Sequence, residues 1–448
     1  MTYSLSEFNP SIYFKKFDNS NHIVIAYSGG IDSSVLLNIM CANKEHLKQS
    51  IEVIHVNHGL HEKSSNWEDF CKKECEKYKV TFKSIKIQED CPKENSVEAW
   101  ARNMRYKLIS KHVKKNDILI TAHHKDDQVE TFFLQLLRGS GVHGLASMPV
   151  IKEFKNGFHV RPFLSFQRNE ITKYAKENNI SWIDDETNLD INYQRNFLRH
   201  NVLPTIDENW LSYRESILRV ISHQADSMKI HNEIAQLDME KISCNDTSNL
   251  HVGLIKELSE ERKKNLIFFW LKNLNLETPS SKHMKQIISA LINSDQQKSP
   301  CVNWGNTEVR RYKKFLYASN IVDNHESDIE ITWDINSPLM IEGETLTTIE
   351  SQGKGLSKEC IKDANIIIRY RHGGEKIYTN SLSQSKSIKQ LFQERSVLPW
   401  LRNKIPLIYI NDELAVVPGF CVGRKFSADK NESSLDILWS GYNKVIQN

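Results

Sequence analysis

Residues 22–34 of this chain are HIVIAYSGGIDSS, and this stretch decides the fold. An apolar, β-branched run ends in Ser-Gly-Gly and a helix-prone segment follows, which predicts a strand, a tight turn and the start of a helix. Gly29 and Gly30 permit positive φ and let the backbone come close to a ligand. Backbone N–H groups at the positive end of a helix attract an anion, and we expect a phosphate here.

An ordinary strand-to-helix turn is the alternative, because Gly and Ser are common in turns. A lone Gly-Gly would favour that alternative. Ser-Gly-Gly-x-Asp-Ser directly after a buried strand is more specific, and it resembles the pyrophosphate loop of the ATP pyrophosphatase (PP-loop) superfamily. The Walker pattern G-x-x-x-x-G-K-[ST] occurs nowhere in the sequence, which argues against a P-loop kinase or GTPase. The resemblance implies an enzyme that uses ATP to adenylate its substrate.

Composition is that of an ordinary globular chain: 448 residues, 39% hydrophobic and 26% charged, enough for two or three domains. The net charge is only +3, so binding of nucleic acid would depend on local basic patches. Eight cysteines are scattered without a C-x-x-C pair, which indicates thiols in a reducing compartment. The first residues lack the apolar core of a signal peptide, and no apolar run approaches the ~18 residues of a membrane span. We therefore expect a cytoplasmic protein without a membrane partner.

Strand-like and helix-like segments alternate from residue 22 to about 200. This alternation, with short connections, predicts an α/β fold with a doubly wound parallel sheet. Strands are expected at 22–27, 51–56, 80–87 and 117–121, and helices at 96–115, 126–138 and from a Ser165 cap to 178. Ligands of such sheets bind at the carboxyl ends of the strands, so Ser28, His55 and His123 are expected at one site.

The pattern predicts three domains: a PP-loop catalytic domain over residues 1–204, a mainly helical domain over 205–325 and a small α+β domain over 326–448. Pro204 marks the first boundary, and the polar stretch 319–327 is a candidate linker. Short strands at 329–333, 365–370, 407–410 and 414–417, with a helix at 387–395, make up the last domain. Basic runs at 262–264 and 310–314 are candidate phosphate contacts, or else ordinary solvated surface.

A second cluster, TAHHKDDQVET, occupies residues 121–131 after the fourth strand. Asp127 and Glu130 are three residues apart, so a helix places them on one face. Together with Asp32 they are candidate ligands of Mg²⁺, an ion that keeps several waters and bridges phosphates. Alternatively, the acidic residues complement the helix dipole and the histidines help to cap the helix. A phosphate loop at the same sheet edge favours the functional interpretation.

Basic residues form two further groups. Arg102 and Arg105 share one face of an expected helix, where they could bind phosphate through their guanidinium groups or simply make ion pairs on a solvated surface. In the second group, residues 185–199, polar side chains suit nucleotide contact and surface solubility equally well. The histidines of HVNHG, residues 55–59, lack nearby cysteines and make a weak zinc site, so nucleotide contact is the preferred interpretation. Candidates for contact with nucleotide or with the phosphates of a nucleic acid are His55, His58, Arg105, His124, Arg195, Asn196 and Arg199.

Taken in order, these motifs resemble the tRNA(Ile)-lysidine synthetase family, and the resemblance spans nearly the whole chain. The matching segments are SGGIDS (28–33), HVNHG (55–59), ARNMRY (101–106), HHKDDQVET (123–131), RGSG (138–141), Arg161-Pro162, residues 185–199, RHGGE (371–375) and PWLR (399–402). The resemblance implies that ATP adenylates the C2 carbonyl oxygen of the wobble cytidine in the isoleucine tRNA with a CAU anticodon. Free L-lysine then displaces AMP through its ε-amine, which gives lysidine and changes decoding from AUG to AUA.

The resemblance also implies roles for individual residues. The ATP-binding residues would be Ser28, Gly29, Gly30, Ile31, Asp32 and Ser33, and the catalytic ones Asp32, Asp127, Glu130 and Arg102. Lysine must attack as the neutral amine, so a nearby carboxylate could take its proton. The oligomeric state stays open, with a homodimer as one option, as do the residues that grip lysine and the basis for rejecting methionine tRNA.

Three alternatives are weaker. A PP-loop tRNA thiolase also adenylates a base, but such enzymes carry paired cysteines, and Cys71-x-x-x-Cys75 has the wrong spacing. Amidating relatives such as GMP or NAD synthetases would lack the appended domains. A non-catalytic tRNA-binding or scaffold protein with a relic ATP fold conflicts with the intact SGGxDS and DDQxE motifs.

Overall fold

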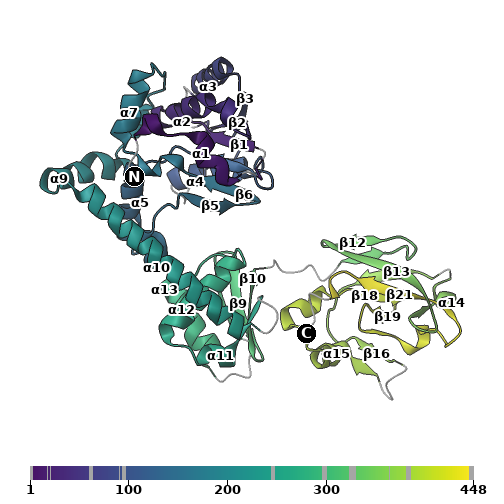
Figure 1. The fold of residues 1–448 in the computed structure, drawn as a ribbon. Helices are drawn as coiled ribbons and strands as arrows, with labels where there is room; N and C mark the ends of the chain where they lie inside the picture. Colours follow the sequence, from purple (N-terminus) through teal and green to yellow (C-terminus); the bar gives the residue numbers. More distant parts are fainter. Residues whose placement is uncertain are drawn as a thin grey trace. The chain divides into compact units, whose positions relative to one another are not determined.

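The computed structural model describes residues 4–17, 19–20, 22–59, 64–89, 91–92, 97–243, 248–294, 300–321, 329–362, 364–379 and 385–442. The chain divides into two compact units, Met1–Ile234 and Ala235–Asn448 (Figure 1). Within the described ranges, no helix combines the length and the apolar character that a membrane crossing needs.

The first unit is built on a six-stranded sheet with the order β3-β2-β1-β4-β6-β5. Its strands are β1 (His22–Ala26), β2 (Ser50–Asn57), β3 (Thr81–Lys86), β4 (Ile118–Ile120), β5 (Ile151–Phe154) and β6 (Gly157–Val160). All neighbouring pairs are parallel except β5 with β6. The predicted parallel α/β sheet is thereby confirmed.

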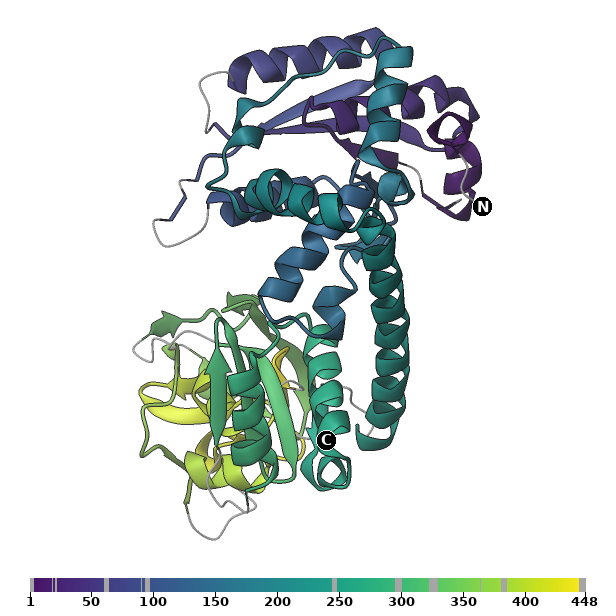
Figure 2. The same ribbon diagram turned by 90° about the vertical axis from the view of Figure 1, so that its left-hand side faces the viewer.

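Helices cover both faces of this sheet (Figure 2). Ile23 and Ile25 of β1 join one apolar core, while Val24 joins another on the opposite face. This two-sided burial explains why β1 is a continuous apolar run without alternation. The main helices are α2 (Ile31–Ala42), α3 (Ser64–Tyr78), α4 (Val97–Ser110), α5 (Lys125–Leu137) and α7 (Arg168–Glu177), with short helices α1 (Pro10–Phe14) and α6 (Val142–Leu145).

The order of the strands positions the site. From β1 the chain adds β2 and β3 on one side, then crosses over to add β4 on the other side. The direction of winding therefore reverses between β1 and β4, and the carboxyl ends of these two strands flank the crevice where such sheets bind ligands.

The start of α7 corrects one prediction. Ser165 does not cap this helix, because it ends a short 3₁₀ turn, Pro162–Ser165. Gln167 is the N-cap residue instead, and Glu170 three residues later accepts the backbone N–H of Gln167 at 2.7 Å. This reciprocal capping box places the helix start two residues later than a cap at Ser165 would place it.

Several short elements follow α7. They are a 3₁₀ turn (Glu186–Leu189), α8 (Gln194–Phe197), a π-helical segment (Leu198–Val202) and α9 (Leu203–Asn209). Pro204 lies in the first turn of α9, where its missing N–H is harmless. The long α10 (Tyr213–Ile242) then runs from the first unit into the second. The division into three domains at 204 and 325 stays a prediction.

The second unit begins with helices and a four-stranded antiparallel sheet of order β7-β10-β9-β8. The helices are α11 (Val252–Lys256), α12 (Glu260–Asn273) and α13 (Ser281–Gln286), and the strands are β7 (Asn249–His251), β8 (Cys301–Trp304), β9 (Thr307–Tyr312) and β10 (Phe315–Asn320). This sheet was not predicted from the sequence, whose pattern in this region indicated mainly helices. Its β9–β10 hairpin turns at Lys313, whose φ is 52°, without the glycine that usually marks such a turn.

The last part of the chain holds two further sheets around one apolar core. One contains β11 (Glu330–Thr332), β15 (Ile366–Arg369), β18 (Leu407–Ile410), β19 (Glu413–Val417) and β20 (Cys421–Val422); the other contains β12 (Leu339–Ile341), β13 (Glu344–Gln352), β21 (Ser433–Trp439) and β14 (Leu356–Ser357). A two-stranded ribbon of β16 (Lys376–Ile377) and β17 (Lys386–Ser387) and the helices α14 (Lys358–Ile361) and α15 (Ile388–Glu394) complete it. The candidate linker 319–327 lies outside the described residues after position 321.

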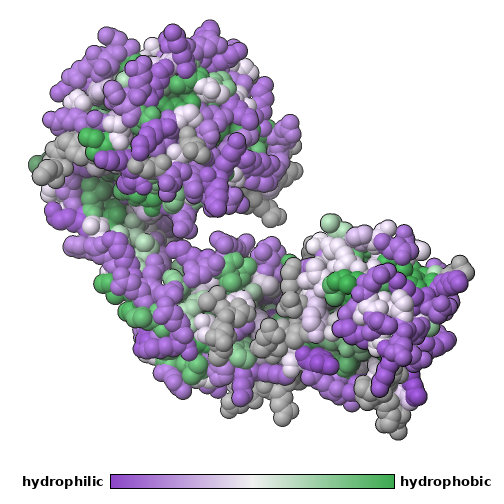
Figure 3. Space-filling view, turned by 45° about the vertical axis from the view of Figure 1, so that its right-hand side comes forward, coloured by the Kyte–Doolittle hydropathy of each residue, from purple (hydrophilic) through white to green (hydrophobic). Residues whose placement is uncertain are grey.

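Apolar side chains concentrate in these cores, and hydrophilic side chains cover most of the face seen in Figure 3. The predicted strands and helix of the α+β part match observed elements closely. The chain thus has a parallel α/β sheet first, a region with several helices next and a small α+β part last, which confirms the predicted fold class.

Candidate active site

The turn from β1 to α2 is a tightly bonded loop. Gly29 has a φ of +82°, a conformation that glycine adopts without strain. The hydroxyl of Ser33 donates to the Gly30 carbonyl at 2.9 Å and lies 3.1 Å from the hydroxyl of Ser28. The Gly29 carbonyl accepts the backbone N–H of Ile183 at 2.9 Å, so a distant segment holds the loop from outside.

The backbone N–H groups at the start of α2 are not capped by a side chain. Gly30 is the N-cap residue and offers no side chain to cap the helix. The N–H groups of the first helical turn therefore point outward without an internal partner, at the positive end of a twelve-residue helix. Such an end is a ready site for a phosphate.

A histidine surrounded by carboxylates lies beside this loop. His124, at the start of α5, is 2% exposed, and its Nε2 lies 3.8 Å from Asp32 Oδ2 and 3.4 Å from Asp127 Oδ2. Its Nδ1 lies 3.6 Å from Asp126 Oδ2. Burial lowers the pKa of His124, but the carboxylates of Asp127, Asp126 and Asp32 raise it more, so the net shift is upward from 6.5. The fold thus brings Asp32 and Asp127 together around one imidazole.

Asp127 also has a structural contact. Its Oδ2 accepts the backbone N–H of His124 at 2.9 Å, so Asp127 takes part in capping the helix, a role that the alternative interpretation gave to the histidines. Its Oδ1 lies 3.8 Å from Arg199 Nη2. Burial raises the pKa of Asp127, whereas His124, His123 and Arg195 lower it more, and the net shift is downward. Asp127 is therefore an ionised carboxylate at neutral pH.

Glu130 forms the centre of a buried ion-pair network. It is 1% exposed and accepts two bonds from Arg199, Nε to Oε1 at 2.7 Å and Nη2 to Oε2 at 3.0 Å. Arg195 Nε lies 3.0 Å from Oε2. Both oxygens of Glu130 are occupied by guanidinium groups, so this carboxylate fixes the position of two arginines next to Asp127.

The residues present fit Mg²⁺ in part. Asp32 Oδ1 is buried and has no hydrogen-bond partner among the described residues, an arrangement that costs free energy unless something binds there. In the described part of the chain, no three His, Cys, Asp or Glu side chains converge as a metal site, and Glu130 is committed to arginines. Asp32 and Asp127 could hold Mg²⁺ only together with water and phosphate oxygens, which is how this ion usually binds nucleotides.

The remaining predicted residues form a second group near the end of β2. His55 donates Nδ1–H to the Tyr27 carbonyl at 2.9 Å and stacks on Phe82. His58 Nε2 accepts from Arg105 Nη2 at 2.9 Å. Arg102 lies over the Tyr106 ring, 5.4 Å from its centroid. The described hydrogen bonds and ion pairs do not link this group to the carboxylates around His124.

Asn196 has a different environment. Its amide Nδ2 donates to the carbonyls of Thr187 and Asp190, at 2.9 Å each. The side chain therefore holds the preceding loop in place. A contact between Asn196 and nucleotide or tRNA stays a prediction.

Several residues that the fold brings to the site received no role from the sequence, although Thr121 and Arg161 lie in motifs quoted above. Thr121 and His159 share a hydrogen bond at 2.9 Å, and Arg161 donates to His159 at 3.1 Å. Arg168 donates its backbone N–H to Asp126 at 3.0 Å. His159 and Arg161 at the end of β6 could have been recognised as site residues from the sequence. That inference would have required knowing that β6 lies next to β4.

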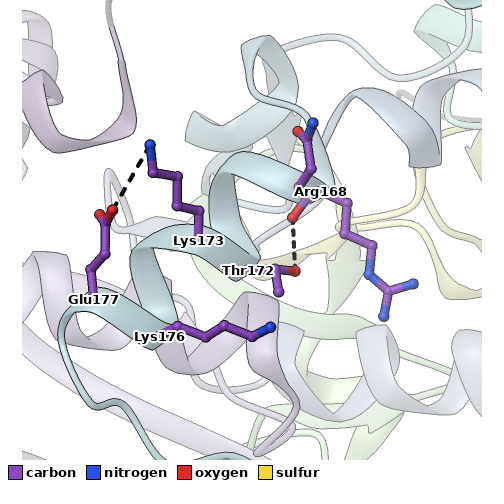
Figure 4. Close-up of a pocket in the computed structure, with 6 residues that line it drawn as sticks. Arg168, Thr172, Lys173, Lys176 and Glu177 are labelled. Atoms are coloured by element: carbon purple, nitrogen blue, oxygen red, sulfur yellow. Dashed lines mark hydrogen bonds and ion pairs between the residues drawn. The ribbon is translucent and has the colours of Figure 1, made fainter.

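The surface of α7 carries a hollow that shares Arg168 with the residues just described. It is lined by Arg168, Asn169, Thr172, Lys173, Lys176 and Glu177, all from one helix (Figure 4). Lys173 and Glu177 form an ion pair at 3.8 Å, and Thr172 donates back to the Arg168 carbonyl. None of the predicted site residues lines this hollow, and its contacts are those of a solvated helix face.

Buried His159 predicts a dependence of stability on pH. Burial is the largest cause that lowers the pKa of His159 from 6.5 to about 2, and the charge of Arg161 is the second. Below pH 6.5, His159 is therefore protonated in the unfolded chain but stays neutral in the folded chain. Between pH 7 and pH 5 we expect the free energy of unfolding to fall by roughly 2 kcal/mol more in the wild type than in His159→Gln, because the full slope of about 1.4 kcal/mol per pH unit is reached only below pH 6.5. Denaturant melts between about pH 7 and pH 5 measure this difference. The same substitution at exposed His46 is the control, and equal slopes for wild type and His159→Gln would contradict the assignment.

The parallel sheet, the glycine turn and the open helix terminus together define an enzyme of the PP-loop class. A family model described as a PP-loop domain matches residues 4–206, a TilS substrate binding domain matches 250–317 and a TilS substrate C-terminal domain matches 366–439. Because relatives that carry this name are more than 30% identical over about nine tenths of the chain, the chain belongs to the tRNA(Ile)-lysidine synthase family, whose members are ligases. This confirms the resemblance found in the sequence.

Two relatives illustrate the match. The tRNA(Ile)-lysidine synthase of Coxiella burnetii is 34% identical over 415 residues, covering 92% of each chain. That of Legionella pneumophila (strain Paris) is 37% identical over 407 residues, covering 90% of this chain and 92% of the relative. Among solved structures, a U34-tRNA thiolase from Methanococcus maripaludis is similar over 48% of this chain and 80% of that chain, at a TM-score of 0.39 and 15% identity. That last likeness is too low to support any conclusion.

Proposed function

We propose that this chain ligates free L-lysine to C2 of the wobble cytidine of the CAU-anticodon isoleucine tRNA, through an adenylated cytidine. The product, lysidine, changes decoding from AUG to AUA. The observation that carries the proposal is the convergence of the open α2 terminus with Asp32, Asp127 and His124 at one sheet edge. The family's two substrate domains in the same chain support tRNA as the substrate.

The first step would be adenylation. The C2 carbonyl oxygen attacks the α-phosphorus of ATP, an O–P bond forms, and the bond to the bridging oxygen breaks as pyrophosphate leaves. N–H groups of the loop and the α2 terminus stabilise the negative charge that grows on the leaving group. Asp32 and Asp127 would hold Mg²⁺, which supplies further charge neutralisation. Arg195 and Arg199, fixed by Glu130, contribute positive charge on the same side as Asp127.

The second step would be attack by lysine. The neutral ε-amine forms a C–N bond at C2, the C2–O bond breaks, and AMP leaves while the amine loses a proton. Asp127 is ionised, so it can hold the lysine ammonium group before the reaction. The ammonium group first loses one proton to become the neutral amine that attacks, and the nitrogen loses a second proton, which Asp127 could accept, once the C–N bond has formed. This role is compatible with a part in binding Mg²⁺ in the preceding step.

The second unit would bind the rest of the tRNA. Binding through phosphates should weaken steeply as salt concentration rises, because counterions are released. The cytoplasm as location and Mg²⁺ as cofactor belong to this proposal.

Incorporation of radiolabelled lysine into the CAU-anticodon isoleucine tRNA tests the function. We expect label to enter the tRNA only with ATP present, and Asp127→Asn to reduce incorporation by roughly a hundredfold or more. Pyrophosphate release that depends on tRNA but not on lysine would isolate the first step. Label that never enters the tRNA would refute the proposal, and full activity of Asp127→Asn would remove that residue from the mechanism.

A further inference from the structure

The buried side chains of Thr121, His159 and Arg161 form a series of hydrogen bonds that ends at His123. They join the ends of the neighbouring strands β4 and β6. Thr121 follows β4, and its hydroxyl lies 2.7 Å from His123 Nδ1 and 2.9 Å from His159 Nε2. His159 lies on β6, opposite Leu119 of β4 in the parallel register. Arg161 Nη2 lies 3.1 Å from His159 Nδ1. His159 is 3% exposed and Arg161 6%, so water does not compete freely for these bonds.

Because arginine can only donate hydrogen bonds, the position of each proton in this series of hydrogen bonds can be assigned. Arg161 has no acceptor, so it must donate to His159 Nδ1, and that nitrogen carries a lone pair. The proton of His159 is therefore on Nε2, which donates to the Thr121 hydroxyl. Among the described residues, the Thr121 hydroxyl has no partner other than the two histidines. Its own hydrogen then goes to His123 Nδ1, since an unused buried hydroxyl hydrogen would cost free energy.

The surroundings keep both rings neutral. The His159 ring packs against Tyr106 and Phe154, with centroids 5.5 Å and 5.9 Å away. Burial is the main cause that lowers the pKa of His159 to about 2 and that of His123 to about 3. Arg161 is among the charges that lower both pKa values further. With Nδ1 accepting and the ring neutral, the single proton of His123 is on Nε2.

We propose that Thr121, His159 and Arg161 are positioning residues that hold His123 in the neutral tautomer protonated at Nε2. His123 then presents a hydrogen-bond donor, and not a base, to an oxygen of the bound nucleotide. His123 Nε2 has no hydrogen-bond partner in the described part of the chain, and the side chain is only partly buried. The identity of the oxygen acceptor rests on the proposed function, whereas the tautomer does not. The proton of the lysine amine then goes to another group, and the proposed function assigns this role to Asp127.

The tautomer can be measured directly. Two-bond ¹H–¹⁵N spectra of the full chain, labelled with ¹⁵N-histidine, distinguish a protonated from an unprotonated ring nitrogen, and the His123→Gln spectrum assigns the signal. We expect unprotonated Nδ1 and protonated Nε2 for His123 in the wild type and in Thr121→Ser, which keeps the hydroxyl. In Thr121→Val, which keeps the shape without the hydroxyl, the His123 signal should change to a mixture of tautomers. Protonated Nδ1 in the wild type would overturn the proposal, whether or not the variants fold.

Kinetics tests the consequence for the site. We expect Thr121→Val to lower kcat for tRNA-dependent pyrophosphate release about tenfold with little change in KM for ATP, and Thr121→Ser to restore it. An unchanged kcat in a folded Thr121→Val variant whose tautomer has changed would overturn the donor role. If the wild type releases no pyrophosphate with tRNA, the proposed function fails, and the spectra still decide the tautomer independently.

Discussion

Replacing Gly29 with alanine is expected to reduce ATP-dependent pyrophosphate release about a hundredfold, because the loop that would hold ATP can no longer keep its shape. A φ of +82° strains any residue with a Cβ, by roughly 1–2 kcal/mol. The added Cβ would also lie 2.9 Å from Ile183 Cδ1 and 3.0 Å from Cys71 Sγ. Relief of this crowding pushes the turn away from the segment whose N–H holds the Gly29 carbonyl. Steady-state pyrophosphate assays and denaturant melts measure the two effects.

Gly30→Ala is the matched control for the fold. Gly30 has a φ of −72°, and a Cβ there would meet nothing nearer than the Ser28 hydroxyl at 3.6 Å. Its free energy of unfolding should therefore equal that of the wild type within about 0.5 kcal/mol. A Gly29→Ala protein as stable and as active as the wild type would show that the turn is not a rigid cradle.

Replacing Glu130 with alanine is expected to lower the free energy of unfolding by about 3–5 kcal/mol, the range for breaking a buried ion pair. The loss arises because Arg195 and Arg199 would remain partly buried without the carboxylate that both of them contact. Activity should fall as well, since these guanidinium groups would no longer be fixed beside Asp127. Glu130→Gln keeps acceptor oxygen and volume, so it should lose less stability than Glu130→Ala. Urea melts of the two variants give the difference.

The Lys173–Glu177 pair on α7 provides a surface control (Figure 4). Both side chains are more than half exposed, at 76% and 59%, and Glu177→Ala should cost no more than about 0.5 kcal/mol. Should Glu130→Ala cost as little as Glu177→Ala, Glu130 would not hold the arginines, and a direct role in binding lysine or metal would gain support.

Local sequence was sufficient to predict the strand, turn and helix that carry the candidate active site. The apolar run before Ser28 predicted a buried strand, and Gly29 and Gly30 predicted the turn before the helix. These features follow from backbone conformation and side-chain periodicity, which a short window of sequence contains. The ordered motifs were also sufficient for the family, because each one is a short segment with its own spacing.

The contacts that make the site work were decided by tertiary structure. Asp32 meets His124 because the strand order places β4 beside β1, and Glu130 meets Arg199 across 69 residues. His159 became visible only as a residue on the strand next to β4. The four-stranded sheet of the second unit was missed for a related reason, since its hairpin lacks a glycine signal at Lys313. The sequence by itself determined the strand, turn and helix around Gly29, whereas pairing between distant segments, which no local periodicity encodes, decided which charges and protons face one another.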